Sequence, residues 1–465
     1  VDVLVKLTGT GQQGSLLKAF TYQQPPQALI RDKGRVYDLA LDPSGSYLFA
    51  AQGEAGVLVY AVNAGDNVVN PDDLLRLLDR NRDGRDDRVI SKISLPGGFI
   101  AVGVEPYFER ASDRAYITGV RLDGSGNAIE SRLFTVAFDQ LDPARTTLLS
   151  ALELPSKAVR GLRVRNARVL LAMGEEGVGI VDAFLPNKTY LVESLATESK
   201  LPLLDIATQN ATLGDADLLV GVGGAFNFKT NMLLTQEANG SGGFYVFKQD
   251  KARGLQRLAQ LDLPGTRISL QGRYAYVAAG SGGVVVVDLL NPAKPQVVAR
   301  LNDIGYVYDL DFNGNTLYVA RGNKGVLTID VTDPLRPLPG RSMEAPAGGS
   351  VESVVADAYS ALAGGLEANG SIVQVVPDVL LRLHMVDPRN GILDRQPDGS
   401  LQVIARFSKA IDQYLANEQK FHLLGPQGET LTANVAITSN DARLTLENSS
   451  ADQLRVGDRL TLLVK

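Results

Sequence analysis

The chain has 465 residues, of which 47 are glycine, and a formal net charge of −6 at pH 7. It contains no cysteine, which excludes disulfide scaffolds, zinc–thiolate sites and cysteine nucleophiles, and it contains no tryptophan. Acidic and basic residues are mixed along the chain without a basic stripe, so nucleic acid is not an expected partner. No apolar run reaches the roughly 18 residues that a membrane span needs, so direct membrane insertion is not expected either.

Residues 1–24 predict the end of a small β domain. The chain begins in a strand-like run at residues 1–5 without a charged-then-apolar signal sequence, which indicates a mature product or an excised fragment. Residues 19–22 follow a Gly-Gln-Gln-Gly turn and resemble the last hairpin of an IPT/TIG immunoglobulin-like domain. Pro25 and Pro26 then predict a stiff linker.

A repeated phrase organises residues 28–378. The pattern Gly-x-x-Gly-Val-x-φ-φ-Asp-x-x-x-Pro, in which φ is apolar, begins at Gly280 and again at Gly322, 42 residues later. Another copy begins at Gly174, and a degenerate copy, which keeps only part of the pattern, begins at Gly53. A period near 42 that is built from short apolar runs is typical of a β-propeller. The sequence therefore predicts an all-β chain with a seven-bladed β-propeller, with six or eight blades as alternatives.

The third-strand segments of this repeat resemble a known family. Residues 284–288 (VVVVD) and 326–330 (VLTID) are similar to the LVIVD repeat, and residues 178–182 are similar in part. Residues 41–50 resemble the YVTN type of surface-protein propeller repeat. The resemblance implies a bacterial or archaeal protein that is secreted or held at the cell surface. It implies no particular activity, because propellers host many functions.

Three insertions interrupt the repeat, at residues 62–88, 119–130 and 225–242. Residues 225–234 are apolar for a loop, so this segment packs against its own blade, caps the channel mouth, contacts a neighbouring domain or binds a partner. Residues 123–127 (DGSGN) predict a plain hairpin turn rather than an ion-binding loop. The glycine-rich stretches at 221–224 and 280–283 predict turns rather than phosphate loops, because neither opens a helix.

The first insertion contains a predicted calcium loop at residues 79–87 (DRNRDGRDD). Calcium prefers six to eight oxygen ligands on a tightly turned loop. The predicted ligands are the side chains of Asp79, Asn81, Asp83 and Asp87 and the backbone carbonyl of Arg85. Ile90 stands where an EF-hand has a bidentate Glu, so the shorter loop resembles those of integrin-type propellers and dockerin-like repeats. The alternative is a solvated charged loop. A calcium ion here would be structural.

Residues 379–465 predict a C-terminal Ig-like β-sandwich. Pro-x-x-Gly at 388–391, Phe-Ser-Lys-x-Ile-Asp at 407–412 and Leu-x-x-Gly at 454–457 resemble the bacterial Ig-like domain of the S-layer SbsA type. That resemblance implies a spacer or stalk. The two histidines of the chain, His384 and His422, lie in this module and are expected on strand surfaces rather than at a site.

These patterns predict a non-enzymatic segment of a large secreted or cell-surface bacterial protein, with no catalytic residue. The propeller would be an adhesion or interaction platform for a protein or a surface glycan, with Ig-like domains of the same chain as spacers and with structural calcium. The alternative is a propeller hydrolase or lactonase with a metal in the central channel. Asp38, Asp309 and Glu352, near the first strands of blades, are the residues that favour this alternative.

Overall fold

The structure is a computed structural model that describes residues 2–6, 13–17, 30–32, 34–61, 89–109, 112–139, 142, 145–197, 201–209, 216–234, 243–250, 253–345, 348–356, 360–367, 370–377, 383–387, 401–407, 421–424, 430–438, 441–446 and 461–464. These residues form strands and one 3-10 turn, η1 (Pro96–Gly98). None of the helical structure among them is long and apolar enough to cross a membrane. The chain divides into two compact units, Pro25–Pro377 and the combination of Val1–Gln24 with Asp378–Lys465.

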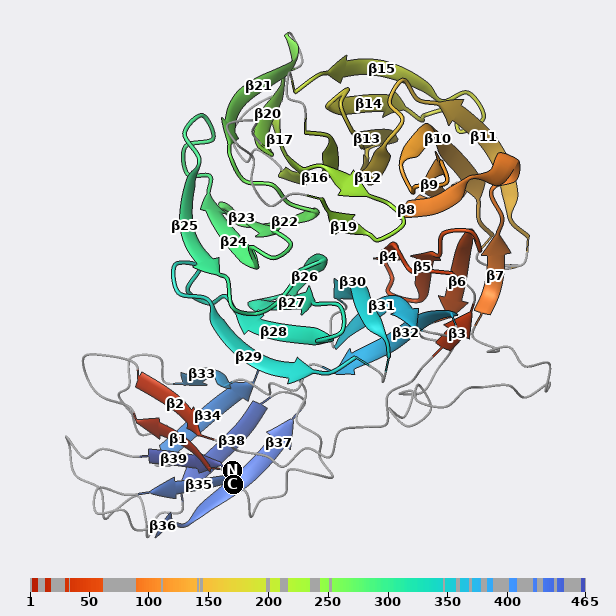
Figure 1. Cartoon of the computed structure of the whole chain (residues 1–465). Coiled ribbons are helices and arrows are strands. Elements are labelled where there is room, and N and C mark those ends of the chain that lie inside the picture. The colour runs from red at the N-terminus through yellow and green to blue at the C-terminus, as the bar shows by residue number, and fades with distance from the viewer. Residues whose placement is uncertain are drawn as a thin grey trace. The chain divides into compact units, whose positions relative to one another are not determined.

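The unit Pro25–Pro377 is a β-propeller, in which four-stranded antiparallel sheets form a ring (Figure 1). We call the centre of this ring, which the innermost strands line, the central channel. The first four sheets, each from its innermost to its outermost strand, have the following bounds. Sheet 1 is β4 (Asp38–Leu41), β5 (Tyr47–Ala51), β6 (Val57–Ala61) and β7 (Val89–Ile93). Sheet 2 is β8 (Ile100–Glu109), β9 (Ser112–Leu122), β10 (Ala128–Ala137) and β11 (Thr147–Glu153). Sheet 3 is β12 (Val159–Arg165), β13 (Arg168–Met173), β14 (Val178–Asp182) and β15 (Tyr190–Leu195). Sheet 4 is β16 (Leu203–Gln209), β17 (Ala216–Gly223), β20 (Phe244–Asp250) and β21 (Gly254–Leu261).

The remaining sheets of this unit continue around the ring. Sheet 5 is β22 (Arg267–Gln271), β23 (Tyr274–Ala278), β24 (Val284–Asp288) and β25 (Gln296–Leu301). Sheet 6 is β26 (Asp309–Asn313), β27 (Thr316–Ala320), β28 (Val326–Asp330) and β29 (Leu338–Met343). Sheet 7 is β30 (Ser350–Ala356), β31 (Ser360–Glu367), β32 (Gly370–Pro377) and β3 (Ile30–Asp32). A two-stranded hairpin, β18 (Phe226–Asn227) and β19 (Met232–Leu233), is inserted in sheet 4.

Sheet 7 closes the ring with strands from both ends of the unit. β3 is antiparallel to β32, and Ile30 pairs with Val373. The outer strand of this sheet therefore comes from the beginning of the propeller, and the other three strands come from its end. Backbone hydrogen bonds across this pair hold the circle closed, because no covalent link joins the two ends.

The repeated phrase builds the turn between the second and third strands of a sheet. Its first glycine bridges to the next sheet, as in the pairing of Gly280 with Val307. Its second glycine packs under the outer strand. At Gly283 the φ angle is +74°, and an added Cβ would lie 1.8 Å from the carbonyl oxygen of Leu301. A larger residue would be strained at this φ and would clash with the backbone, so the glycines mark turns, as the sequence predicted.

The aspartate of the phrase forms a turn after the third strand. Oδ1 of Asp182 accepts a hydrogen bond from the backbone N–H two residues later at 3.0 Å, Oδ1 of Asp288 does so at 2.8 Å, and Oδ1 of Asp330 does so at 2.9 Å. These are Asx turns, in which a short carboxylate replaces a backbone carbonyl. The constant spacing of this aspartate within the phrase thus serves the backbone turn.

The apolar run of the third strand is buried on both of its faces. In β24, Val285 and Val287 pack in a cluster with residues of sheet 4, such as Val246. Val284 and Val286 pack in another cluster with residues of sheet 6. A strand that is covered on both faces has a continuous apolar run rather than an alternating one, which explains the valine run of β24.

The second unit consists of two antiparallel sheets. One sheet has the order β2 (Gln13–Leu17), β1 (Asp2–Lys6), β39 (Thr461–Val464), β35 (Phe421–Leu424) and β36 (Thr430–Leu431). The other has the order β33 (Leu383–Asp387), β34 (Leu401–Phe407), β38 (Asp441–Leu446) and β37 (Ala433–Thr438). Val403, Leu444 and Leu446 are buried in this unit. His384 lies on β33 and His422 on β35.

The structure joins the two termini, which the sequence analysis had assigned to separate modules. The strand β1 pairs with β39, so that Val3 lies opposite Val464. The strands β1 and β2 are thus part of the same five-stranded sheet as the C-terminal strand. Pairing between strands more than 450 residues apart leaves no local pattern in the sequence, which is why the sequence suggested two domains.

Candidate functional site

Four charged side chains occupy equivalent positions on the innermost strands of four sheets. Asp38 lies opposite Ala51, Arg267 opposite Ala278 and Asp309 opposite Ala320, the last residue of the second strand in each sheet. Asp205 lies opposite Val222, the last residue but one of its second strand. The shared register places these side chains in one layer of the central channel, which we call the Arg267 layer. All four residues are buried.

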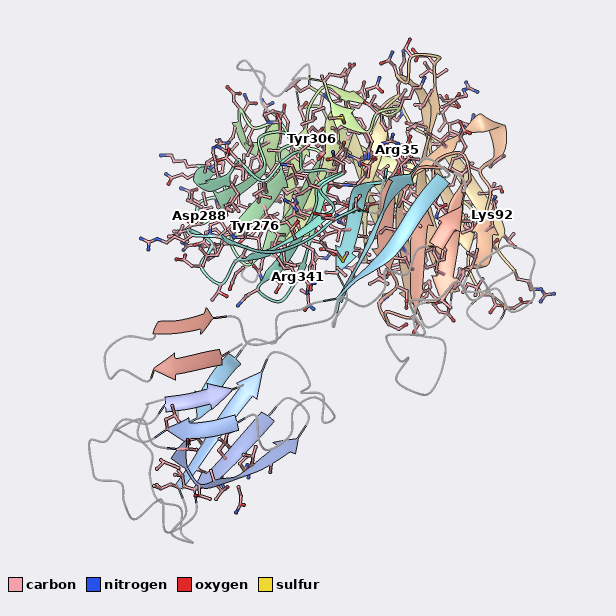
Figure 2. All side chains as sticks on the ribbon, turned by 60° about the horizontal axis from the view of Figure 1, so that its bottom comes forward. Arg35, Lys92, Tyr276, Asp288, Tyr306 and Arg341 are labelled. Carbon is pink, nitrogen blue, oxygen red and sulfur yellow. The ribbon has the colours of Figure 1, made fainter. Side chains whose placement is uncertain are left out.

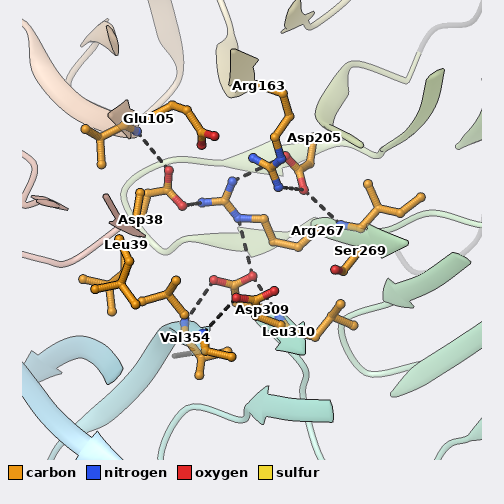
Figure 3. Close-up of a pocket in the computed structure, with 17 residues that line it drawn as sticks. Asp38, Leu39, Glu105, Arg163, Asp205, Arg267, Ser269, Asp309, Leu310 and Val354 are labelled. Atoms are coloured by element: carbon orange, nitrogen blue, oxygen red, sulfur yellow. Dashed lines mark hydrogen bonds and ion pairs between the residues drawn. The ribbon is translucent and has the colours of Figure 1, made fainter. Parts of the chain in front are cut away.

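Arg267 pairs with the three aspartates of this layer (Figure 3). Its Nη2 donates to Oδ1 of Asp38 at 2.7 Å, its Nη1 lies 3.6 Å from Oδ1 of Asp205, and its Nε lies 3.8 Å from Oδ1 of Asp309. Burial opposes the charge on the guanidinium, but the three carboxylates outweigh it and raise the pKa of Arg267. The arginine therefore stays charged in the interior of the protein.

The second oxygen of each aspartate binds the inner strand of the next sheet. Asp38 Oδ2 accepts the N–H of Val104 at 2.9 Å, and Asp205 Oδ2 accepts the N–H of Ile268 at 3.0 Å. In the same way, Asp309 Oδ2 accepts the N–H of Val354 at 3.1 Å. Each carboxylate thus joins two neighbouring sheets and the central arginine. This arrangement stabilises the ring, and it leaves these acids little freedom to act on a substrate.

A cavity of about 280 Å³ adjoins the Arg267 layer. Glu105, Arg163, Ser269 and Asp311 line it as well, and each lies on an inner strand and is partly exposed. We call this cavity the channel pocket. The other lining residues, among them Leu41, Val104 and Val355, have apolar side chains, but the surface that lines the cavity is mainly polar.

Three acids of the channel pocket, Glu105, Asp309 and Asp311, have pKa values above those of free carboxylates. Burial raises the pKa of Glu105 to about 7, with Arg163 opposing and Asp38, Asp205 and Asp311 reinforcing the shift. Burial also raises the pKa of Asp309 to about 6, against the lowering effect of Arg267. Both shifts arise first from burial, which disfavours the charged form of a carboxyl group.

The opposite end of the channel is closed by the β18–β19 hairpin. Asn231 is buried and bridges two charged residues: Nη2 of Arg160 donates to its Oδ1 at 3.2 Å, and its Nδ2 donates to Oε2 of Glu352 at 2.8 Å. Glu352 also accepts from Nη1 of Arg35 at 2.6 Å. The Arg160 guanidinium carbon lies 4.9 Å from the centre of the Phe226 ring. Arg160 and Glu352 lie on β12 and β30, so the hairpin contacts sheets far from its own.

Three more hydrogen bonds fix the hairpin to the ring. The hydroxyl of Tyr37 donates to the carbonyl of Phe228 at 3.0 Å, and the N–H of Leu233 donates to the hydroxyl of Tyr306 at 2.7 Å (Arg35 and Tyr306 are labelled in Figure 2). The N–H of Phe228 donates to the carbonyl of Gly126 at 3.2 Å. Gly126 belongs to the β9–β10 hairpin turn that the sequence predicted at residues 123–127, where Asp123 Oδ1 accepts the N–H of Asn127 at 2.9 Å. Among the alternatives for residues 225–234, the structure supports a cap over the channel.

The structure separates the acids that favoured a metal-dependent hydrolase. Asp38 and Asp309 belong to the Arg267 layer, whereas Glu352 lies at the hairpin end and binds Arg35 and Asn231. Within the described ranges, no group of three or more His, Asp or Glu side chains is arranged to hold a metal ion. The predicted calcium loop, with Asp79, Asn81, Asp83, Arg85 and Asp87, lies outside the described residues and stays a prediction.

The sequence analysis missed several residues of the channel, namely Asp205, Arg267, Glu105, Arg163 and Asp311. A signal for Asp205 was present, because it follows two apolar residues at the start of a first strand, as Asp38 follows Val36 and Tyr37. Arg267 gave no such signal, since arginine replaces aspartate at that position of the repeat. Its role depends on which side chains the closed ring brings opposite it.

Comparisons with known proteins agree with this fold. The family model "LVIVD repeat" matches residues 265–303 and 304–338, which contain sheet 5 and the first three strands of sheet 6, so the predicted repeats at 284–288 and 326–330 are confirmed. A search of the curated protein sequences returned no match. The chain is similar to the crystal structure of Chaetomium thermophilum Raptor, with 11% identity and a TM-score of 0.51 over 76% of this chain and 29% of that chain.

A second similar structure is that of the RRP9 WD40 repeats, with 13% identity and a TM-score of 0.50 over 76% of this chain and 99% of that chain. Our chain thus spans less than a third of the Raptor chain but nearly all of the RRP9 chain. At such low identity these likenesses show the β-propeller fold alone.

Proposed function

We propose that this chain is a non-enzymatic interaction platform, in which the seven sheets are the seven blades of a rigid propeller and the rim binds a protein partner. The distribution of exposed apolar side chains carries this proposal. Of the eleven large hydrophobic side chains that are exposed in the described part of the chain, nine lie on a fourth strand or on the loop that leads to it. These nine are Leu148, Phe184, Leu185, Tyr190, Val192, Leu290, Val297, Leu335 and Leu338.

The fourth strands form the outer edge of the ring (Figure 1), and Asp288, where one such loop begins, lies at that edge in Figure 2. The exposed apolar side chains are densest on sheet 3, where Phe184 is 74% exposed, Leu185 54%, Tyr190 56% and Val192 50%. We call these four residues the rim patch. Aromatic residues are enriched at protein–protein interfaces, and exposed apolar groups that gather on one surface are typical of docking sites.

The rim patch continues toward sheet 2. The hydroxyl groups of Ser150 on β11 and Thr189 next to β15 are 3.1 Å apart, so the outer strands of the two sheets meet there. Leu148, on β11, is 45% exposed. A partner that covers the rim patch would therefore contact two blades, whose relative position the ring fixes, and binding would cost little conformational entropy on the side of this protein.

The channel supports a structural rather than a catalytic role for its acids. The aspartates that would serve a hydrolase are bonded to Arg267 and to the backbone of neighbouring sheets. The hairpin occupies the opposite end of the channel through Asn231 and Phe228. We therefore assign the function to the outer surface of the propeller, which binds a partner, and not to its channel.

The wider setting is part of the same proposal. The resemblance to LVIVD and YVTN repeats supports a secreted or cell-surface protein of a bacterium, and an adhesive role follows from a surface that binds a partner. The two antiparallel sheets of the second unit support an Ig-like sandwich that acts as a spacer. The spacing of Asp79, Asn81, Asp83 and Asp87 supports a structural calcium ion in the first insertion.

The test is a binding experiment with rim variants. A photo-crosslinking amino acid at position 185 should capture one extracellular protein, and the purified pair should bind in solution. The double variant Phe184→Ser, Tyr190→Ser should weaken that binding at least tenfold. A matched double variant at exposed polar positions of the same unit, Glu175→Gln with Glu176→Gln, should bind as the parent chain does. If both double variants bind the partner equally well, the rim patch is not the binding surface.

A separate measurement tests the hydrolase alternative. The chain, supplied with Ca²⁺, Mg²⁺, Mn²⁺ or Zn²⁺, is assayed with lactones and phosphotriesters. Turnover that disappears in Asp309→Asn, while the variant keeps its folded circular dichroism spectrum, would overturn the non-enzymatic assignment.

A further inference from the structure

The channel pocket has more negative than positive charge. Five carboxylates line it, from Asp38, Glu105, Asp205, Asp309 and Asp311, against two guanidinium groups, from Arg163 and Arg267. The Arg267 layer uses one of these arginines to pair three of the acids. Nη2 of Arg163 lies 4.0 Å from Oδ2 of Asp205, and Arg163 also interacts with Glu105 and Asp311, the two partly exposed acids at the mouth of the pocket. The acids of the pocket therefore outnumber its arginines.

One buried oxygen in this pocket has no hydrogen bond. Asp205 is fully buried, and its Oδ1 accepts no hydrogen bond within the described part of the chain, although Nη1 of Arg267 lies 3.6 Å away. The Nε of Arg267 likewise donates to no acceptor there. A buried carboxylate oxygen without a donor is costly, because water that would have solvated it has been removed. A ligand that brings N–H donors into the pocket would supply what this oxygen lacks.

The wall of the pocket selects the kind of cation. The carboxylates are not grouped as ligands of one metal ion, and Arg267 stands among three of them. A small organic cation fits better, because an ammonium group offers three donors on a compact head. The apolar part of the wall, which includes Leu41 and Val355, is small and leaves room for only a short alkyl chain behind that head. A volume of about 280 Å³ is enough for such a molecule.

We propose that the channel pocket binds a primary ammonium group on a short alkyl chain, either in a free alkyl diamine or at the end of a lysine side chain of a protein partner. Glu105 and Asp311 attract the ammonium at the mouth, and one of its N–H donors supplies the hydrogen bond that the buried Oδ1 of Asp205 lacks. The site is independent of the rim patch, so it goes beyond the interaction function proposed above, and either proposal stands if the other fails.

The test is calorimetric titration of the full chain with 1,4-diaminobutane at pH 8, with neutral 1,4-butanediol as the matched control ligand. The diamine should bind and the diol should not. The double variant Glu105→Gln, Asp311→Asn should weaken the binding at least tenfold, because it removes two charges with little change of shape. The double variant Glu175→Gln, Glu176→Gln, which removes two charges from an exposed turn, should bind the diamine as the parent does.

A second arm needs no variant. Acidification from pH 8 to pH 5.5 adds a proton to Glu105, because burial raises its pKa to about 7. Arg163 opposes this shift, and Asp38, Asp205 and Asp311 reinforce it. The amines stay charged over the same range. Binding should weaken at least tenfold. A titration with Nα-acetyl-lysine N-methylamide then distinguishes the sources: binding of this compound points to a lysine side chain, and binding of the diamine alone points to a free amine. If neither amine binds at about 10 mM, or if the pocket variant binds as well as the parent, the proposal is wrong.

Discussion

Nη2 of Arg267 donates a hydrogen bond of 2.7 Å to Oδ1 of Asp38, although 229 residues separate the two in sequence. The bond runs from sheet 5 to sheet 1 across the channel, while the second oxygen of Asp38 binds the N–H of Val104 in sheet 2. The centre of the propeller is thus held by a charged network and not by apolar packing alone. Such a network is costly to break, because removal of one partner leaves buried charges unpaired.

We expect Arg267→Met to lower the free energy of unfolding by about 3–5 kcal/mol, since the aspartates that remain in the layer would be buried without a counter-charge. Urea unfolding at pH 7 measures this. The control is Arg273→Met, at a side chain that is 47% exposed and pairs with Asp288 at 3.1 Å. Exposed pairs contribute less than about 1 kcal/mol. Equal losses in the two variants would contradict a structural role for the Arg267 layer.

The second glycine of the repeated phrase should be more sensitive than an ordinary turn glycine. Gly283→Ala places a Cβ 1.8 Å from the carbonyl oxygen of Leu301, whereas Gly272→Ala, at a φ of +56°, meets no described atom within 4 Å. Both variants lose about 1 kcal/mol because alanine disfavours positive φ. Gly283→Ala should lose at least about 2 kcal/mol more, because the outer strand must move. Thermal unfolding of the two variants tests this prediction. Similar melting temperatures would contradict it and would show that β25 moves aside at little cost in stability.

The stability of the fold should fall as the pH rises through neutrality because of Glu105. Its pKa is raised from about 4.5 in the unfolded chain to about 7 in the folded protein, so between these values the folded state holds the proton and the unfolded state does not. Asp309, raised to about 6, acts in the same direction. Glu105→Gln should therefore be more stable than the parent at pH 8, on the order of 1 kcal/mol, and nearly equal to it at pH 5. Urea midpoints at the two pH values measure the difference, and a larger gain at pH 5 than at pH 8 would contradict the assignment.

The cap over the channel depends on Asn231. Asn231→Ala removes both hydrogen bonds that link Arg160 to Glu352, and it leaves these charges without their neutral bridge. We expect a loss of about 2–3 kcal/mol in unfolding free energy and faster hydrogen exchange at the amide of Phe228. Thr230→Ala, in an exposed position of the same hairpin, is the control and should change neither. Unchanged exchange at Phe228 in Asn231→Ala would show that other contacts hold the hairpin.

The predicted calcium loop gives a prediction that is independent of the channel. A chelator should lower the melting temperature of the chain, because an ion that binds the native state alone stabilises it. Restoring Ca²⁺ should restore the melting temperature. The variant Asp79→Asn, Asp83→Asn should melt at the same temperature with and without the chelator. If the parent chain also shows no difference, residues 79–87 are a solvated loop.

The sequence by itself determined the features that repeat within one blade. The glycines at Gly280 and Gly283, the aspartate at Asp288 and the valine run between them each answer a local requirement, namely positive φ, an Asx turn and burial on both faces of a strand. These requirements recur about every 42 residues, so the pattern is sufficient to indicate a propeller.

The tertiary structure alone decided which residues meet across long distances. The pairing of β1 with β39 and of β3 with β32 joins strands from opposite ends of their units. The contact of Arg267 with Asp38 and the bridge of Asn231 between Arg160 and Glu352 likewise depend on closure of the ring. Local sequence patterns report the backbone conformation and burial of neighbouring residues. They do not report which side chain a closed circle places opposite another, and that placement is what forms the channel pocket of this protein.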